Sequence, residues 1–263
     1  MPEGVEIEIY RLAAERALGR VIATVDANDG WFCKDGTTPE ALVAALSGAT
    51  FTSARRRGKL LVLDVDHGPR LGLRFGMTGR TIVDDAAPID SLEYSSDRND
   101  PAWDRFAVLF DDGGSLRIRD PRRLGGVSLD PDEEALGMDA FSVTAKELDR
   151  RVFVGEVAIK GRLLDQARVA GIGNLIADEV LWRAGIDPAA PAGSIDAKGR
   201  RRFRSHLQTV LADFMRDGGS HTGRLQPARE RGGTCPKDGT PLERRTIGGR
   251  TTFSCPLHQR SGR

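Results

Sequence analysis

The sequence predicts an α+β protein built from two different halves. Short extended runs separated by glycine-rich turns dominate the chain up to about residue 140, which favours an antiparallel sandwich or barrel over a doubly wound sheet. Beyond that point apolar residues recur at helical spacing, which predicts a helical second half. A chain of 263 residues can form one large domain or two medium ones and bury a core without disulfide bonds.

The first half is expected to open with a helix and continue as strands. Apolar residues recur at helical spacing in the opening segment, which Gly19 can stop; they are Val5, Ile9, Leu12 and Ala13. The expected strands are residues 21–25, 60–65, 71–75, 106–110 and 115–119. Asp-Asp-Gly-Gly at 111–114 is typical of a hairpin turn between the last two. The polar interval 84–103 contains two prolines and is expected to be a loop.

Two longer helices and a small hairpin are expected in the second half. Asn174 can cap a helix that runs towards Gly185. A second helix is indicated by an apolar stripe that ends near Gly218 and consists of Phe203, Leu207, Val210, Leu211 and Phe214. The tail at 235–258 centres on Thr-Ile-Gly-Gly-Arg at 246–250, which predicts two strands around a turn.

Composition predicts a folded cytoplasmic protein. Hydrophobic residues at 39% and charged residues at 29% lie near the globular average, and no stretch approaches the roughly 18 apolar residues of a membrane span. Glu3 and Glu6 stand where a signal peptide carries basic residues, and no apolar segment follows them. Three cysteines, an odd number, build no disulfide framework and fit a reducing compartment.

Charge is segregated along the chain. Residues 191–263 hold fifteen Lys or Arg against six Asp or Glu, a net +9, whereas residues 1–190 carry a net −8. Such a basic segment suggests a polyanionic partner, because phosphate contacts dominate affinity for nucleic acids. The alternative is a solvated basic face with no partner.

The tail carries a candidate metal site. Cys235 and Asp238 are followed, after sixteen intervening residues, by Cys255 and His258, which is the spacing of a two-knuckle zinc ribbon. Asp and His are both permitted zinc ligands, so the four side chains could close a tetrahedral site. The alternative is a metal-free hairpin held by packing. Cys33 stands alone in sequence and is expected to be a buried apolar residue.

The N-terminus carries a candidate nucleophile. If Met1 is removed, as the small Pro2 permits, Pro2 presents a free secondary amine beside the Glu3 carboxylate. An α-amino group has a pKa of about 8, so a useful fraction is unprotonated at neutral pH. Attack on an aldehyde-like sugar carbon would give a proline iminium, which stays cationic and acts as an electron sink. The alternative is that proline merely follows the initiator methionine, as it often does.

Six motifs in the same order resemble the formamidopyrimidine-DNA glycosylase and endonuclease VIII family. They are Met1-Pro2-Glu3-Gly4 with Glu6, Arg57-Gly58-Lys59, Gly76-Met77-Thr78-Gly79, Asp120-Pro121-Arg122-Arg123, Gly171-Ile172-Gly173-Asn174 with Ala177-Asp178-Glu179, and Arg250-Thr251-Thr252-Phe253-Ser254-Cys255. The resemblance implies a multidomain α+β fold: an N-terminal antiparallel β-sandwich flanked by helices, and a C-terminal helix-two-turn-helix domain with a β-hairpin zinc finger. We place these parts at 1–130, 131–219 and 220–263.

The resemblance also implies roles for individual residues. Pro2 is similar to the Schiff-base nucleophile, and Glu3 to the general acid that assists loss of the base or opening of the sugar ring. Lys59 and Arg250 resemble the further catalytic pair, which contacts phosphates beside the lesion and takes part in proton transfer. The residues that resemble DNA contacts are Arg74, Met77, Arg122, Leu124, Lys160 and Asn174.

Three of these residues resemble the group that fills the gap left by an everted base. An apolar wedge at Met77 and Leu124 replaces lost stacking, and the Arg122 guanidinium can satisfy the orphaned partner base. Leu124 departs from the aromatic residue more usual at its position, and a leucine stacks less. Met77 could equally be a core residue, and Lys160 a solvated lysine.

Other departures bear on the substrate. Arg74 stands where formamidopyrimidine glycosylases usually have histidine, which preserves phosphate attraction and removes a titrating group. The interval from Gly218 to Cys235 is short, and in the family this interval carries the loop that closes over 8-oxoguanine. Its brevity argues against selective recognition of that base.

We therefore expect a bifunctional DNA glycosylase and abasic-site lyase. It would excise oxidised bases from double-stranded DNA, among them formamidopyrimidines, oxidised pyrimidines and, if the short interval allows it, 8-oxoguanine, and nick the strand by β,δ-elimination. We expect a monomer that holds structural Zn²⁺, needs no other cofactor and works on the nucleoid. The alternatives are a protein of the same fold that binds lesions or abasic sites without excision, and a plain helix-two-turn-helix nucleic-acid module.

Overall fold

The computed structural model describes residues 2–89, 92–93, 95–96 and 98–259. Contacts within the chain divide it into two compact units. The N-terminal unit comprises residues 1–2 and 6–133, and the C-terminal unit comprises residues 3–5 and 134–263. Residues 3–5 thus group with a part of the chain that follows them by more than a hundred positions.

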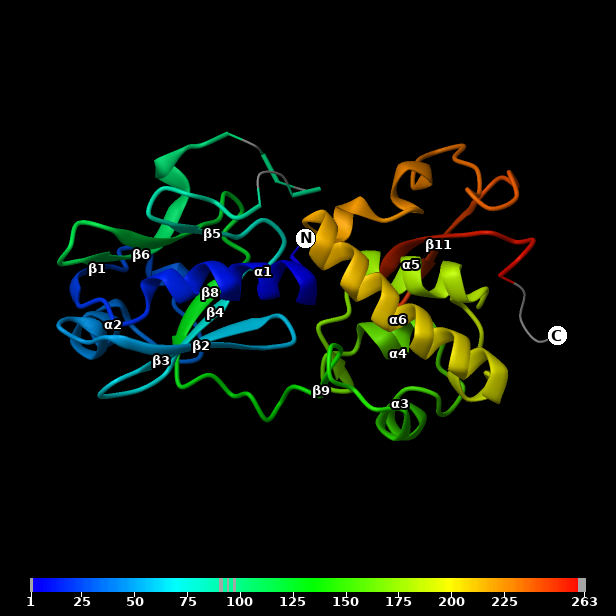
Figure 1. Cartoon of the computed structure of the whole chain (residues 1–263), viewed down its shortest axis with the longest axis horizontal. Coiled ribbons are helices and arrows are strands. Elements are labelled where there is room, and N and C mark those ends of the chain that lie inside the picture. The colour runs from blue at the N-terminus through cyan, green and yellow to red at the C-terminus, as the bar shows by residue number, and fades with distance from the viewer. Residues whose placement is uncertain (1, 90–91, 94, 97, 260–263) are drawn as a thin grey trace. The chain divides into compact units, whose positions relative to one another are not determined.

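The described strands of the N-terminal unit form two four-stranded antiparallel sheets (Figure 1). The first has the order β1-β6-β7-β5, with bounds Ile22–Asp26, Asp104–Phe110, Ser115–Arg119 and Arg80–Val83. The second has the order β2-β3-β4-β8, with bounds Phe51–Arg57, Leu60–Val65, Leu71–Arg74 and Gly126–Leu129. Both sheets contribute to one core, which confirms the predicted sandwich.

The sandwich core is built from alternating residues of both sheets. Phe106 and Val108 of the first sheet and Leu61 and Leu73 of the second are each at most 1% exposed and belong to the same cluster. Alternate side chains of a strand point to the same face, so this spacing directs each apolar set inward. The predicted turn at 111–114 joins β6 to β7, as expected.

Two helices accompany the sandwich. The predicted first helix is α1, Gly4–Ala14, and its Ile7, Tyr10 and Ala14 lie in the sandwich core. The helix α2, Pro39–Leu46, follows β1 and was not predicted from the sequence. Thr38 caps α2 by accepting a hydrogen bond from the N–H of Ala41.

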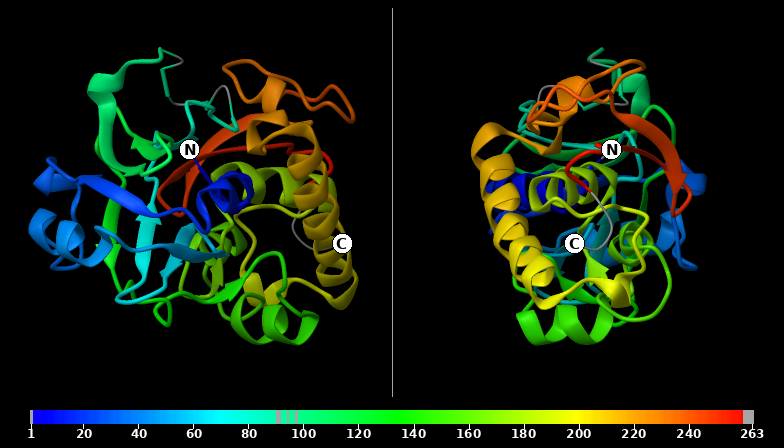
Figure 2. Two further views of the ribbon diagram at one scale, coloured as in Figure 1. Left: turned by 60° about the vertical axis from the view of Figure 1, so that its left-hand side comes forward. Right: turned by 90° about the vertical axis from the view of Figure 1, so that its right-hand side faces the viewer.

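The C-terminal unit is mainly helical, as predicted. Its helices are α3, Ala145–Arg151; α4, Ile159–Leu164; α5, Asn174–Ala184; and α6, Ala197–Asp217. The short strands β9, Met138–Asp139, and β10, Val169–Ala170, pair in parallel. Helix α6 runs alongside α5 (Figure 2), and all five residues of its predicted apolar stripe are buried.

Helix termini in this unit follow simple stereochemistry. Gly185 and Gly218 adopt the left-handed conformation just after α5 and α6, which a residue without Cβ accepts most readily. Asn174 is not the cap of α5, contrary to expectation: Gly173 holds that position, and Asn174 is the first helical residue. Across the described ranges, no helix is both long and apolar enough to span a lipid bilayer.

The tail forms the predicted hairpin. Strand β11, Glu243–Ile247, pairs antiparallel with β12, Arg250–Ser254, around the turn at 248–249. Beside the hairpin, a small apolar cluster joins Trp182 of α5 to Leu225, Cys235 and Cys255. The hairpin is therefore attached to α5 through packing as well as through the polar contacts described below.

Three strands were missed from the sequence because their patterns are atypical. Strand β2 ends in Arg55, Arg56 and Arg57 where alternation would place apolar residues, and β5 begins with a buried Arg80. Strand β8 contains only Val127 and Leu129 as apolar side chains. In the described part of the interval 84–103 there is no α-helix and no strand, as expected of a loop.

Candidate functional site

The Glu3 carboxylate closes the N-terminus of α5. The side chain is 0% exposed. Its oxygens accept hydrogen bonds from the backbone N–H groups of Gly173, Leu175 and Ile176 at 3.0, 2.8 and 3.1 Å. The first N–H groups of a helix have no partner within it, and the helix dipole favours a negative charge there. Residue 3 therefore does for α5 what a local capping side chain does for most helices.

Glycines make this approach possible. A Cβ atom at Gly173 would lie 2.2 Å from Cδ of Glu3, so no other residue fits there without displacing the carboxylate. The N–H of Gly4 also donates to the carbonyl of Gly171 at 2.8 Å. The Gly-Ile-Gly-Asn motif, which alone could be an ordinary tight turn, is shaped to receive the start of the chain.

We expect Glu3→Gln to destabilise the fold as well as to alter chemistry. A glutamine carries one acceptor atom instead of two and turns an NH₂ group towards the helix N–H groups, and hydrogen bonds to charged groups contribute about 1.5–3 kcal/mol. Urea unfolding should show a loss of this size. Glu15→Gln, at a half-exposed carboxylate, should leave the unfolding free energy nearly unchanged, and equal stability of the two variants would contradict the capping role.

The residues predicted to perform catalysis are distributed over both units. Pro2 is buried and immediately precedes Glu3 and α1, and Met1 lies outside the described residues. Lys59 lies with Gly58 in the turn between β2 and β3 and is half-buried. Arg250 is exposed at the start of β12, after two glycines with positive φ. Pro2 and Lys59 belong to the N-terminal unit, Glu3 and Arg250 to the C-terminal unit.

Asp120 organises the loop that carries two of the predicted wedge residues. Its buried carboxylate accepts from the hydroxyl of Thr78, from the N–H of Arg122 at 3.2 Å and from the N–H of Gly125 at 2.8 Å. Leu124 is 49% exposed on this loop. Asp120 and Thr78 lie in motifs visible in the sequence, but nothing there indicated that they bond to each other.

The other wedge residue, Met77, lies in the turn after β4 and is half-buried. That turn contacts the wedge loop through backbone atoms: a Cβ on Gly76 would lie 2.4 Å from the carbonyl carbon of Leu124. Arg74, at the end of β4, pairs with Asp35 at 2.8 Å. Arg122 itself is exposed.

Gly76→Ala should cost more stability than Gly113→Ala. Both glycines have positive φ, at 55° and 88°, but only Gly76 would meet other atoms through an added Cβ. The conformational cost is about 1 kcal/mol for each, and Gly76→Ala must also displace the loop around Leu124. Urea unfolding measures both; equal losses would show that the loop moves aside freely.

A buried ionic cluster fixes β12 to the helices. Lys160 of α4 is 0% exposed, and its Nζ lies 2.6 Å from Oδ1 of Asp178 and 2.6 Å from Oγ1 of Thr252. Burial lowers the pKa of Lys160, and the Asp178 carboxylate opposes this shift. Arg229 pairs with the other oxygen of Asp178. The solvated-lysine alternative for Lys160 is thus wrong.

Asn174 reaches the same strand. Its amide Nδ2 donates to the carbonyl of Thr251 at 3.2 Å, and the Lys160 ammonium donates to that carbonyl at 3.4 Å. The amide oxygen of Asn174 is buried and has no hydrogen-bond partner in the described part of the chain. Two residues predicted as DNA contacts therefore hold the residue next to Arg250.

Adjacent Glu179 holds the segment that leads to the tail. Its carboxylate accepts from the N–H groups of Arg224 and Leu225 at 3.2 and 2.9 Å. Together with the Asp178–Arg229 pair, this fastens the short interval between Gly218 and Cys235 to α5. The sequence offered one signal for these roles, since two adjacent acids in an otherwise apolar buried helix require partners.

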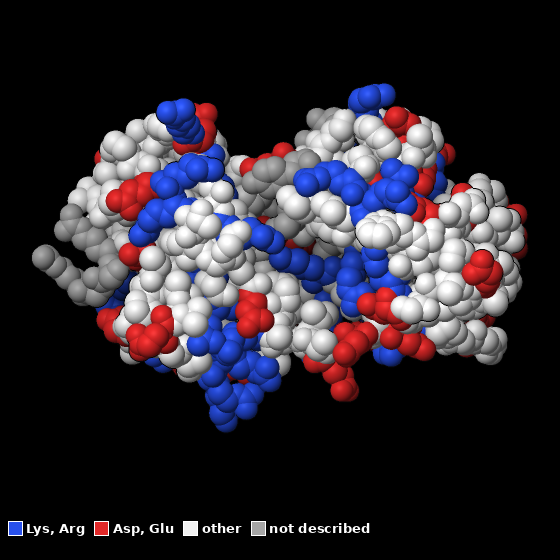
Figure 3. All heavy atoms as spheres, turned by 180° about the vertical axis from the view of Figure 1, so that it is seen from behind, with Lys and Arg blue, Asp and Glu red and all other residues white. Residues whose placement is uncertain are grey.

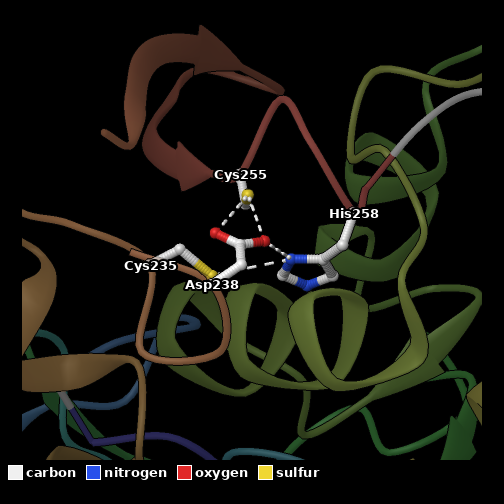
Figure 4. Close-up of side chains that lie close together, drawn as sticks. All are labelled: Cys235, Asp238, Cys255 and His258. Carbon is white, nitrogen blue, oxygen red and sulfur yellow. Dashed lines mark hydrogen bonds and ion pairs between the residues drawn. The ribbon is translucent and has the colours of Figure 1, made fainter. Parts of the chain in front are cut away.

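The four predicted metal ligands lie together (Figure 4). One ligand atom from each of Cys235, Asp238, Cys255 and His258 lies within 4.8 Å of the other three. Oδ2 of Asp238 is 3.2 Å from Nδ1 of His258 and 3.3 Å from Sγ of Cys255. Cys33, expected to be buried, is half-buried against the sandwich core, and burial raises the pKa of its thiol.

The surroundings of this cluster suit a cation. Nε2 of His258 lies 3.0 Å from the carbonyl of Trp182, which can only accept, so the proton resides on Nε2 and leaves the Nδ1 lone pair for the cluster. The indole N–H of Trp182 and the backbone N–H of Lys237 each donate to Sγ of Cys235 at 3.4 Å. The hydrogen bond from the N–H of Thr240 holds the pKa of Asp238 well below its usual range. Two thiols, a carboxylate and an oriented imidazole therefore fit a tetrahedral metal site.

Basic side chains are numerous on the surface. On the face shown in Figure 3, Lys and Arg gather in several clusters with Asp and Glu between them. Every basic side chain of α6 is at least partly exposed. Such a surface attracts a polyanion at long range without selecting its sequence.

Family models and curated relatives match nearly the whole chain. Residues 1–127 match the formamidopyrimidine-DNA glycosylase N-terminal domain, and residues 127–224 match the H2TH domain of the same enzymes. The chain belongs to the formamidopyrimidine-DNA glycosylase family. It is 32% identical to the formamidopyrimidine-DNA glycosylase of Nocardioides sp., over 98% of this chain and 94% of the relative. It is 34% identical to that of Acidithiobacillus ferrooxidans, over 99% and 100%.

Solved structures agree with this DNA glycosylase in fold. A complex of the LlFpg protein with THF-DNA and an inhibitor has a TM-score of 0.83 at 25% identity, over 98% of this chain and 100% of the other. A complex of Lactococcus lactis Fpg with DNA containing an abasic site has a TM-score of 0.82 at 24% identity, over 98% and 99%. The predicted fold class, with N-terminal sheets and a helix-two-turn-helix domain, is confirmed.

Proposed function

We propose that this glycosylase is bifunctional and that Pro2 is its nucleophile. With Met1 removed, the Pro2 nitrogen attacks C1′ of the damaged nucleotide, and the bond from C1′ to the base breaks with its electron pair leaving on the base. Opening of the C1′–O4′ bond then gives an iminium at Pro2. The observation that carries the proposal is the Glu3 carboxylate, next to Pro2 in sequence, anchored by three N–H groups at the N-terminus of α5.

Glu3 is suited to moving protons in this reaction. Its carboxylate form is favoured by the N–H groups around it, so it can accept the proton that the Pro2 nitrogen loses on forming the bond to C1′. The same carboxyl group can return a proton to O4′ as the sugar ring opens. The cationic iminium then permits loss of a C2′ proton and of the 3′ phosphate, followed by loss of the 5′ phosphate, which together are β,δ-elimination.

The remaining predicted residues hold the DNA. Lys59 and Arg250 are proposed to contact the phosphates beside the lesion, and Arg74 a further phosphate. Met77, Arg122 and Leu124 are proposed to fill the gap left by the everted base. For Lys160 and Asn174 we propose that any effect on DNA binding is exerted through β12, because both bond to Thr251.

We propose oxidised pyrimidines and formamidopyrimidines as substrates. The interval between Gly218 and Cys235 is short and is fastened to α5 through Asp178 and Glu179, which leaves little chain to enclose a purine such as 8-oxoguanine. Complexes of the Lactococcus lactis protein with DNA carrying an oxidised pyrimidine and with DNA carrying a formamidopyrimidine support this choice. We expect the enzyme to act as a cytoplasmic monomer on duplex DNA.

Borohydride should trap a covalent adduct between the enzyme and DNA that carries an abasic site. Pro2→Gly should strongly reduce adduct formation, and one extra residue before Pro2 should abolish it, because the amine is then an amide. Cys33→Ser, remote in sequence from the N-terminus, should leave the adduct unchanged. Electrophoresis of reduced mixtures with labelled oligonucleotides measures the yield.

An adduct that persists in the extended variant would refute the Schiff base at Pro2. DNA binding without any adduct or base release in the wild type would instead favour the alternative, a protein that recognises lesions without excising them.

We also propose that Zn²⁺ occupies the cluster of Cys235, Asp238, Cys255 and His258. When bound, zinc would act structurally, because four protein ligands leave no open position for a substrate. The side chains would hold the two ends of the tail together and thereby the hairpin that carries Arg250. The donor set is mixed rather than all thiolate, so the site should release its metal to chelators more readily than a four-cysteine finger.

Metal analysis of freshly purified enzyme should find about one zinc per chain, since four ligands close one site. Asp238→Ala and His258→Ala should each lower zinc content and weaken DNA binding, whereas Cys33→Ser should retain full content. His258→Cys should slow zinc loss to a chelator. Active, never-chelated enzyme without zinc would refute the site.

A further inference from the structure

One large aromatic side chain is exposed at a place that no role described so far explains. Trp31 lies in a single 3-10 turn, Gly30–Phe32, between β1 and α2, and is 67% exposed. The next residue, Phe32, is 0% exposed and packs in the sandwich core. A buried neighbour on a tight turn fixes the backbone, so Trp31 is displayed on a rigid support.

The turn is fastened to the loop that carries Leu124. The N–H of Lys34 donates to the carbonyl of Val127 at 2.8 Å, and Arg123 forms an ion pair with Asp29. A Cβ on Gly125 would lie 3.1 Å from the ring of Phe32, so residues adjacent to Trp31 and to Leu124 are in contact. Trp31 and Leu124 are therefore exposed on neighbouring segments of the same unit.

Charge around Trp31 favours an anionic partner. The Lys34 ammonium lies 4.9 Å from the centroid of the indole ring and also donates to the carbonyl of Trp31. Arg122 and Arg123 follow on the wedge loop, and Arg74 pairs with Asp35 four residues after Trp31. Four basic side chains against two acidic ones around an exposed ring fit an aromatic ligand attached to phosphates.

We propose that Trp31 is a stacking platform for a nucleobase of the distorted DNA, next to the wedge. The inference rests on the proposed function of the wedge loop. A leucine at 124 fills space between bases but offers no ring, and the indole of Trp31 supplies a planar surface from the adjoining turn. Stacking on tryptophan accepts every base, so the contact would add affinity for opened DNA without selecting the lesion.

Trp31→Ala and Trp31→Phe distinguish stacking from mere exposure. Binding to a labelled duplex with a tetrahydrofuran abasic analogue is measured by fluorescence anisotropy at fixed salt. Trp31→Ala should raise the dissociation constant about tenfold, and Trp31→Phe should recover most of the loss, because loss of one stacked base has roughly this effect. Leu109→Ala, which removes another exposed apolar side chain of the same unit, should bind as the wild type does.

Two further readouts exclude a structural explanation. The unfolding free energy of Trp31→Ala should equal that of the wild type, and its dependence of log K on log salt should be unchanged, since no phosphate contact is lost. Unaltered affinity of Trp31→Ala would overturn the proposal. A concentration-dependent dimer that disappears in Trp31→Ala would also overturn it, because the ring would then contact a second copy of the chain.

The fate of this proposal is separable from that of the proposed chemistry. Trp31→Ala should still form the borohydride adduct at saturating abasic DNA, because Pro2 is untouched. Loss of the adduct in the wild type would sink the Schiff base while the anisotropy comparison still decided the role of Trp31.

Discussion

The structure depends on one carboxylate more than on any other polar group. Glu3 closes the first turn of α5, and the helix in turn supplies the acids, the asparagine and the indole that position the tail. Because the cap comes from the start of the chain and not from the residue before the helix, α5 is completed only when segments about 170 positions apart meet. The group proposed to move protons is thus also a structural one, and stability and chemistry are coupled at a single side chain.

Buried charge has a comparable role at the other end of α5. Lys160, Asp178 and Arg229 form a cluster in which each charge has a partner, and the backbone of β12 is bonded to it through Thr251 and Thr252. A cluster of this kind stabilises little in net terms, because desolvation offsets much of the attraction, but it is costly to rearrange. It therefore defines where Arg250 can be presented better than apolar packing would.

The sequence predicted local features well and long-range ones poorly. The hairpin of β6 and β7, the apolar stripe of α6 and the four clustered ligands follow from spacing within short segments. Strand β2 was missed because its arginines pair with acids such as Glu8, Asp64 and Glu133 from other segments, and these partners cannot be read from alternation. The cap at Glu3 and the bonds of Asp120 escaped for the same reason: their partners are backbone N–H groups, which carry no residue signature.

The mixed ligand set of the tail has an electrostatic consequence. Zinc held by four thiolates carries a formal charge of −2, whereas two thiolates, one carboxylate and a neutral imidazole leave it at about −1. The hairpin with Arg250 would then repel a phosphate backbone less than an all-cysteine finger does. Replacing thiolates thus trades tightness of metal binding for a weaker local field against DNA, which suits an enzyme that must slide along intact duplex before it stops.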